Sequence, residues 1–240
     1  MKRVLPAIAL IAGLALTGCS GTDSKDSKND QAEDSGSAAQ PATEETPEAV
    51  QLDEDQLKQI IESTDVDGQS YKPVDLGAAS GSEAIKALEK AEYEPAECKD
   101  LALSALNASE AGNGTTLAGT SADNTMSVSL MSLADEKAAG SQLQNSTRVA
   151  EKCSDVTVKT QGIDMKMNYE TFDAVVDGAD ETVGVRAKIS SGGQTVLDTD
   201  TVTSRVGNNL VTAANIADAG DADSVTKTAK TFVEAVKNAG

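Results

Sequence analysis

The side chains in this sequence that could carry chemistry are a serine–lysine pair, two groups of aspartates and three cysteines. Ser224 and Lys227 form a Ser-x-x-Lys pattern, in which a lysine can activate a serine, but no Lys-Thr-Gly or Ser-Asp-Asn segment accompanies it. Segments 65–68 and 218–223 could offer carboxylate oxygens to calcium, yet neither has the glycine spacing and terminal glutamate of an EF-hand loop. We therefore expect Ser224 to lie in the first turn of a helix and these aspartates to serve as turn and cap residues.

The composition excludes several classes of protein. The 240 residues include 20 Lys and Arg, 39 Asp and Glu, and no His or Trp, for a net charge of −19. We expect no nucleic-acid partner, because such binding depends on a basic surface. Without histidine the chain can form no Ser-His-Asp or Cys-His relay and no His-liganded metal site. The sequence thus predicts a protein that is not an enzyme and that needs no cofactor or metal. The alternative is a hydrolase in which two carboxylates converge in a cleft, at least one of them with a raised pKa.

The amino-terminal segment is built like an export signal. Two basic residues precede an apolar run that is too short for a membrane span. The Leu-Thr-Gly-Cys sequence at 16–19 resembles the lipobox of bacterial lipoproteins. The resemblance implies cleavage between Gly18 and Cys19, removal of a signal peptide at 1–18, and attachment of diacylglycerol and palmitate-type chains to Cys19. Membrane lipid would then be a partner, and the protein would be anchored at the extracytoplasmic face of the cell membrane.

Residues 19–50 have the composition of a tether. They are rich in Ser, Asp, Glu, Lys, Ala and Pro and contain no aromatic residue. Such a segment buries too little apolar surface to offset the entropy cost of ordering, so we expect a lipidated, disordered, acidic tether. Residues 51–240 are long enough for one sizeable core, and we expect them to form a single extracytoplasmic domain.

Cys98 and Cys153 are the two cysteines that remain if Cys19 is lipidated. They form an even pair in an exported domain, which favours a disulfide bond between them. A redox-active pair lacks support, because there is no Cys-x-x-Cys arrangement or neighbouring cluster of positive charge. Two free buried thiols are the other alternative.

Hydrophobic periodicity in residues 51–240 predicts an α+β fold. Apolar residues recur at helical spacing in about 53–62, 82–91, 95–106, 135–152 and 221–236. Alternation typical of half-buried strands follows residue 126 and fills most of 155–211, with turn residues at 177–178, 192–193 and 207–209. We expect one antiparallel sheet of about five to six strands, mostly a carboxyl-terminal meander, packed against several helices with a helix closing the chain. The predicted core residues are Met126, Val128, Leu130, Val156, Val158, Val183, Val185, Ile189, Phe232 and Val236.

Three segments resemble the PknH-type extracellular sensor domain of actinobacterial receptor kinases and stand-alone envelope lipoproteins. They are the helix–cysteine–strand junction at 143–159, the Arg205–Val211 strand and the carboxyl-terminal helix, and the similarity covers about residues 75–240. The chain differs from that family in having no Trp and only one cysteine pair beyond Cys19. The resemblance implies a disulfide-stapled α+β domain with a cleft for an unidentified ligand, and it brings no catalytic residues.

These inferences favour a non-catalytic binding or sensor-type lipoprotein that takes an envelope ligand or a protein partner. The chain has only three Tyr and two Phe, so we expect aliphatic and Met side chains to line any pocket. Such a lining would favour an apolar or lipid-like ligand over a sugar. The alternatives are a carboxylate hydrolase of the cell envelope and a structural protein that binds a cell-wall partner through an exposed apolar face.

Overall fold

A computed structural model describes residues 51–74, 83–106, 114–160, 162–216 and 221–239. Residues 1–50 lie outside the described residues, so the signal peptide, the lipidation of Cys19 and the tether stay predictions. Asp218, from the second group of aspartates, also lies outside them. The described residues all belong to one compact unit.

Five helices are found in the described residues, at the positions that the periodicity predicted. They are α1 (Glu54–Ser63), α3 (Glu83–Lys90), α4 (Cys98–Leu106), α6 (Glu136–Lys152) and α7 (Ala222–Ala239). At the start of α1, the Asp53 carboxylate accepts the backbone N–H of Gln56 at 2.8 Å, and the Gln56 side chain accepts the N–H of Asp53 at 3.0 Å. This reciprocal capping box satisfies two N–H groups that a helix leaves unpaired. Among the described helices, none is long and apolar enough to cross a membrane.

The strands form one antiparallel sheet that is larger than expected. They are β1 (Asp65–Val66), β2 (Gln69–Val74), β3 (Glu92–Glu94), β4 (Thr115–Ser121), β5 (Met126–Ser132), β6 (Asp155–Thr160), β7 (Ile163–Phe172), β8 (Glu181–Ser191), β9 (Gln194–Val206) and β10 (Asn209–Asn215). Their order across the sheet is β1-β2-β4-β5-β10-β9-β8-β7-β6-β3. The α+β class and the meander from β6 to β10 are confirmed, but ten described strands replace the five to six predicted.

The additional strands have weak sequence patterns. β1 and β3 are only two and three residues long, β2 contains Pro73, and β4 consists mainly of small residues. Residues 205–211 carried two expectations: the single strand implied by the family resemblance is wrong, whereas the turn predicted at 207–209 is confirmed. The chain turns at Gly207, where φ is 58°, so β9 ends at Val206 and β10 begins at Asn209. Glycine adopts this left-handed conformation without steric cost, which allows a tight hairpin at this point.

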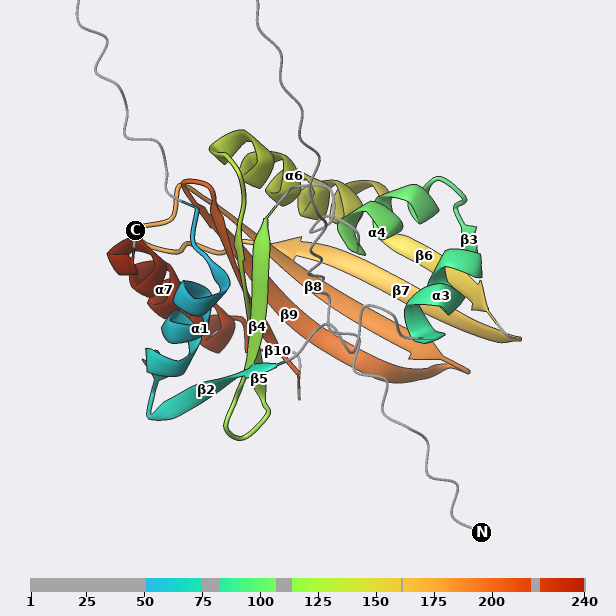
Figure 1. The fold of residues 1–240 in the computed structure, drawn as a ribbon. Coiled ribbons are helices and arrows are strands. Elements are labelled where there is room, and N and C mark those ends of the chain that lie inside the picture. Colours follow the sequence, from blue (N-terminus) through green and yellow to red (C-terminus); the bar gives the residue numbers. More distant parts are fainter. Residues whose placement is uncertain (1–50, 75–82, 107–113, 161, 217–220, 240) are drawn as a thin grey trace, which may run out of the picture. The chain divides into compact units, whose positions relative to one another are not determined.

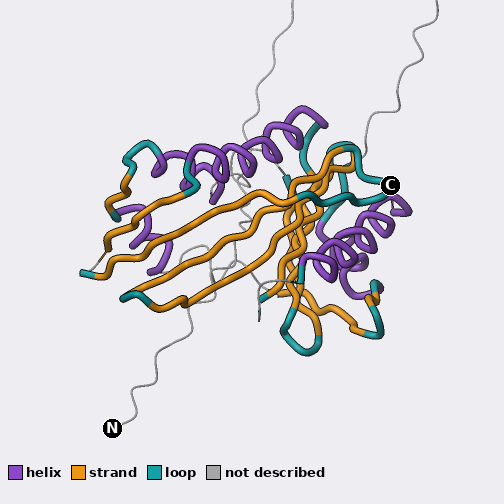
Figure 2. Tube along the Cα trace, turned by 180° about the vertical axis from the view of Figure 1, so that it is seen from behind, coloured by secondary structure: helices purple, strands orange, loops and turns teal. Residues whose placement is uncertain are grey.

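Helices cover both faces of the sheet (Figure 1). Neighbouring residues of β10 point to opposite faces: Leu210 packs with Leu143 of α6, while Val211 belongs to the same buried cluster as Phe232 of α7. α1 packs beside α7 on the second face. Seen from behind, β7, β8 and β9 extend well past α7 (Figure 2). One end of this sheet face is therefore covered by α1 and α7.

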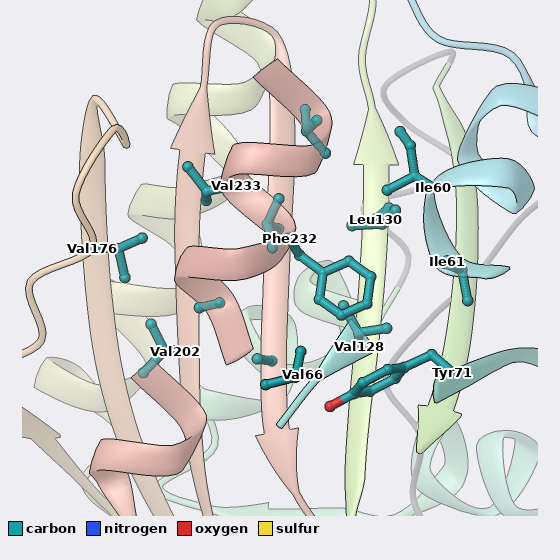
Figure 3. Close-up of a cluster of buried hydrophobic side chains, with 14 of the residues drawn as sticks. Ile60, Ile61, Val66, Tyr71, Val128, Leu130, Val176, Val202, Phe232 and Val233 are labelled. Atoms are coloured by element: carbon teal, nitrogen blue, oxygen red, sulfur yellow. The ribbon is translucent and has the colours of Figure 1, made fainter. Parts of the chain in front are cut away.

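The larger hydrophobic core lies between α1, α7 and the sheet (Figure 3). Tyr71 of β2 and Phe232 of α7 meet edge to face, with ring centroids 5.0 Å apart. Three predicted core residues, Met126, Val183 and Val185, are only half-buried. The other predicted core residues are buried, as expected: Val128, Leu130, Val156, Val158, Ile189, Phe232 and Val236.

A disulfide bond joins Cys98, the first residue of α4, to Cys153, which follows α6 directly. Their Cα atoms are 5.7 Å apart. Both cysteines are buried in a second cluster, with Tyr93 of β3 and Val158 of β6. The predicted pairing is confirmed, and it attaches two helices to each other near the end of the sheet formed by β6 and β3.

Candidate functional site

A pocket of about 300 Å³ lies beside the first turns of α7. Four parts of the chain form its wall: the β1–β2 hairpin, the β4–β5 hairpin, the end of β10 and the start of α7. The lining residues are Val66, Asp67, Gln69, Tyr71, Ser121, Thr125, Met126, Asn215, Asp221, Ser224 and Thr228. This volume is at the lower end of the range for small-molecule sites, about 300–1,000 Å³.

The β1–β2 hairpin is held by its aspartates. Asp67 and Gly68 occupy the two turn positions with φ of 55° and 81°, the left-handed conformation that a two-residue hairpin requires. The Asp65 carboxylate accepts the backbone N–H of Gly68 at 2.6 Å. Asp67 pairs with the ammonium of Lys227 and so connects the hairpin to α7. These aspartates serve in a turn, as predicted.

The first turn of α7 forms another wall. Asp221 caps the helix by accepting the backbone N–H of Ser224 at 3.1 Å. Hydrogen bonds from the side chain and the backbone N–H of Ser224 hold the pKa of Asp221 below its usual value. Ser224 lies in the first helical turn, as predicted, and lines the pocket. The ammonium of Lys227 pairs with Asp67. In the Ser-x-x-Lys pattern, Ser224 therefore belongs to the start of the helix and Lys227 to an ion pair.

Tyr71 and Thr228 are two deeply buried polar residues in the lining. Their side chains are 3% and 2% exposed, and they hydrogen-bond to each other. Burial is the largest cause that raises the pKa of Tyr71, and the hydrogen bond with Thr228 acts in the opposite direction. The charges of Asp123, Asp65 and Asp67 raise this pKa further, because a phenolate would be repelled by them. Tyr71 therefore presents a neutral hydroxyl near several carboxylates.

The β4–β5 hairpin brings a second set of hydroxyls to the pocket. Ser121 is 2% exposed; its hydroxyl donates to Asp123 at 2.6 Å and accepts the N–H of Met126 at 3.0 Å. The hydroxyl of Thr125 donates to the same Asp123 oxygen at 2.8 Å. These bonds, from Ser121 first and then from Thr125, lower the pKa of Asp123, which remains a carboxylate at neutral pH.

Asn215 closes the site at the end of β10 and continues into a row of polar residues across the sheet. It is 6% exposed, pairs in register with Met126 of β5, and accepts the N–H of Asp200 at 2.8 Å. Asp200 is fully buried and receives two hydrogen bonds from Arg186 of β8, at 2.6 and 3.2 Å. A paired buried carboxylate of this kind holds neighbouring strands in register, and here it supports the floor beside Asn215.

The expectation of an aliphatic and Met lining holds for only part of this pocket. Val66 and Met126 are the two apolar residues other than Tyr71 in a lining that otherwise consists of hydroxyl, amide and carboxylate side chains. The reason is positional, because the pocket lies at strand ends, turns and a helix cap, where the backbone recruits polar partners. The aliphatic side chains of the same elements are used in the core between α1, α7 and the sheet.

Two carboxylates of the site keep their negative charge at neutral pH. Asp123 and Asp221 have a lowered pKa, whereas the general acid of a carboxylate hydrolase needs a raised one. In the part of the chain that the structure describes, no group of three or more cysteine or acidic side chains could hold a metal ion. The arrangement can therefore offer hydrogen bonds and negative charge to a small molecule.

Sequence reasoning missed six polar pocket residues: Gln69, Tyr71, Ser121, Thr125, Asn215 and Thr228. One signal was present: Thr228 is a polar residue on the apolar face of the carboxyl-terminal helix, beside Val225 and Phe232. A polar residue at such a position is usually hydrogen-bonded to a buried partner, which here is Tyr71. Nothing in the local sequence of Tyr71 or Asn215 shows that they approach the start of α7.

Comparison with known proteins gives structural neighbours of low similarity. No protein-family model matches the chain, and no curated protein matches it. The extracellular domain of PknH from Mycobacterium tuberculosis is similar with a TM-score of 0.40 and 13% identity, over 52% of this chain and 66% of that one. An uncharacterised protein from Mycobacterium smegmatis, the Rv0999 ortholog, is similar with a TM-score of 0.39 and 15% identity, over 70% of this chain and 86% of that one. The chain thus spans slightly less than two thirds of the PknH domain.

Proposed function

We propose that this protein is a non-catalytic lipoprotein whose extracytoplasmic domain binds a small polar molecule in the pocket beside α7. The pocket carries the proposal. It is about 300 Å³ in volume, and four of its lining residues are polar side chains at least nine-tenths buried, namely Tyr71, Ser121, Asn215 and Thr228. Because each part of the wall comes from a different segment, the pocket exists only in the folded domain and is held in shape before any ligand arrives.

The lining supports a polar ligand in place of the apolar one expected from the sequence. Hydroxyl and amide groups lose their bonds to water when a ligand enters, and only a ligand with its own donors and acceptors replaces those bonds. A lipid chain in this pocket would offer Gln69 and Ser224 no hydrogen-bond partner in place of water.

Mass spectrometry of the molecules that copurify with the protein tests the binding proposal. The full chain is purified from its own host in mild detergent and then denatured to release bound molecules. Ser224→Tyr places a large side chain at an exposed position of the pocket wall; the matched control, Asp223→Tyr, changes the neighbouring exposed position, which is outside the lining. We expect one stoichiometric polar species with the wild type and the control and none with Ser224→Tyr. Retention of the species by Ser224→Tyr, or its absence from the wild type, contradicts the proposal.

Anchoring through Cys19 is tested separately, by the mass of the amino-terminal peptide. The lipobox resemblance predicts that the mature chain begins at Cys19 and carries a diacylglyceryl thioether and a further acyl chain. Two or more chains give durable membrane attachment, whereas a single chain is marginal. A mature terminus elsewhere, or an unmodified Cys19 thiol, would show that the protein is not a lipoprotein.

A further inference from the structure

We propose that the pocket selects a small amine that also carries hydroxyl groups, such as an amino sugar. This inference rests on the proposed function, which leaves the charge of the ligand open. It follows from the charge of the pocket rim together with the hydroxyl and amide groups inside the cavity.

The rim of the pocket is negative. Asp67 and Asp221 line it, and Asp65 and Asp123 belong to the two hairpins that form its wall. Within the described residues, the ammonium that contacts this group is that of Lys227, bound to Asp67. The other three carboxylates accept hydrogen bonds from neutral groups, which orient them but leave their charge in place. Asp67 and Asp221 in the lining, together with Asp65 and Asp123 in the adjoining hairpins, outnumber the ammonium of Lys227, so the rim attracts a cation.

An inorganic cation or an anion suits the pocket less well. The described residues hold no set of three or more acidic side chains arranged around a metal position. The start of α7 would attract an anion, but Asp221 already occupies it as a cap, and a bound anion would face the same carboxylates that repel a Tyr71 phenolate. An organic ammonium meets neither obstacle.

The interior adds a requirement for hydroxyl groups. Ser224, Thr228 and Tyr71 contribute hydroxyls to the lining, and Gln69 and Asn215 contribute amides. These groups can both donate and accept hydrogen bonds, which matches ligand hydroxyls. A volume of about 300 Å³ accommodates a single hexosamine ring.

Calorimetric titration with matched probes tests the inference on the full chain in mild detergent. The first pair is D-glucosamine and N-acetyl-D-glucosamine, and the second is ethanolamine and N-acetylethanolamine; the members of each pair differ in the charged amine. Inorganic phosphate is the anionic probe. We expect at least one amine to bind at least tenfold more tightly than its acetylated partner, with affinity falling as salt concentration rises.

Three substitutions locate the charge effect. Asp221→Asn keeps the helix cap and should weaken amine binding about three- to tenfold, the range for a charge at an exposed rim. Lys227→Met removes the cation that competes for Asp67 and should strengthen binding by a similar factor, a change that misfolding does not produce. Asp177→Asn, at an exposed ion pair with Lys230 outside the lining, is the control and should leave affinity unchanged.

The outcomes separate the two proposals. Equal binding of an amine and its acetylated partner, tighter binding of phosphate, or no gain with Lys227→Met overturns the amine inference and leaves pocket binding in place. A copurifying species without an amine group would likewise overturn the amine inference and leave pocket binding in place. Absence of every probe, together with absence of a copurifying species, overturns both.

Discussion

Reduction of the Cys98–Cys153 bond should lower the free energy of unfolding by about 4 kcal/mol. The bond closes a loop with a sequence separation of 55 residues. In the chain-entropy model, a loop of that length removes about 14 cal/mol/K from the entropy of the unfolded chain, which corresponds to about 4 kcal/mol at 25 °C. That is a large share of the 5–15 kcal/mol typical of a folded domain, so the reduced protein should be markedly easier to unfold.

Urea unfolding followed by circular dichroism measures this difference on the full chain, with and without a thiol-free phosphine reductant. The double variant Cys98→Ala/Cys153→Ala should resemble the reduced wild type, with a further loss of about 1 kcal/mol for each buried sulfur atom removed. It also serves as the control, because its unfolding must not respond to the reductant. Oxidised and reduced wild type that unfold with the same midpoint and slope would refute the reasoning from loop closure.

Two further predictions concern packing and pH. Gly184→Ala should destabilise the domain by about 1–3 kcal/mol, because a Cβ there would lie 2.7 Å from both the ring and the carbonyl oxygen of Phe172. Gly140→Ala in α6, where a Cβ would meet nothing within 4 Å, should stabilise the domain by about 1 kcal/mol. Thermal unfolding measures both variants, and a higher unfolding temperature for Gly184→Ala than for Gly140→Ala would contradict this reasoning. The hydrogen bond and the charge of Lys230 lower the pKa of Asp177 in the folded protein. The stability that this carboxylate contributes is therefore fully present above its unfolded pKa of about 3.9, and it is lost as the pH falls through the lower folded pKa. Asp177→Asn should therefore flatten the dependence of stability on pH below about pH 4, and an identical pH profile for both proteins would refute this.

Local signals in the sequence were sufficient for the helices. Asp53 before α1 and the apolar residues of α7 show why, since both patterns lie within one or two helical turns. The long alternating strands of the meander were also predictable. β1, β3 and β4 were not, because short or small-residue strands are stabilised by their neighbours in the sheet and not by their own pattern.

The pocket depends on long-range contacts, which explains why its polar residues were not predicted. Tyr71 meets Thr228 only because β2 lies against α7, and Asn215 reaches the same cavity from the end of β10. The composition shows which side chains could line a pocket. It does not show that most aliphatic side chains of these elements pack in the core instead. The polar residue on the apolar face of α7 was the local sign that a buried polar contact lay nearby.

A crystal structure of the full chain purified from its own host tests the central claim most directly. Binding in the pocket predicts ordered density for a small polar molecule within hydrogen-bond distance of Ser224 and Asn215, with an amine facing Asp67 or Asp221. A pocket that contains only solvent, or a copurified molecule bound elsewhere on the domain, would contradict the proposed function.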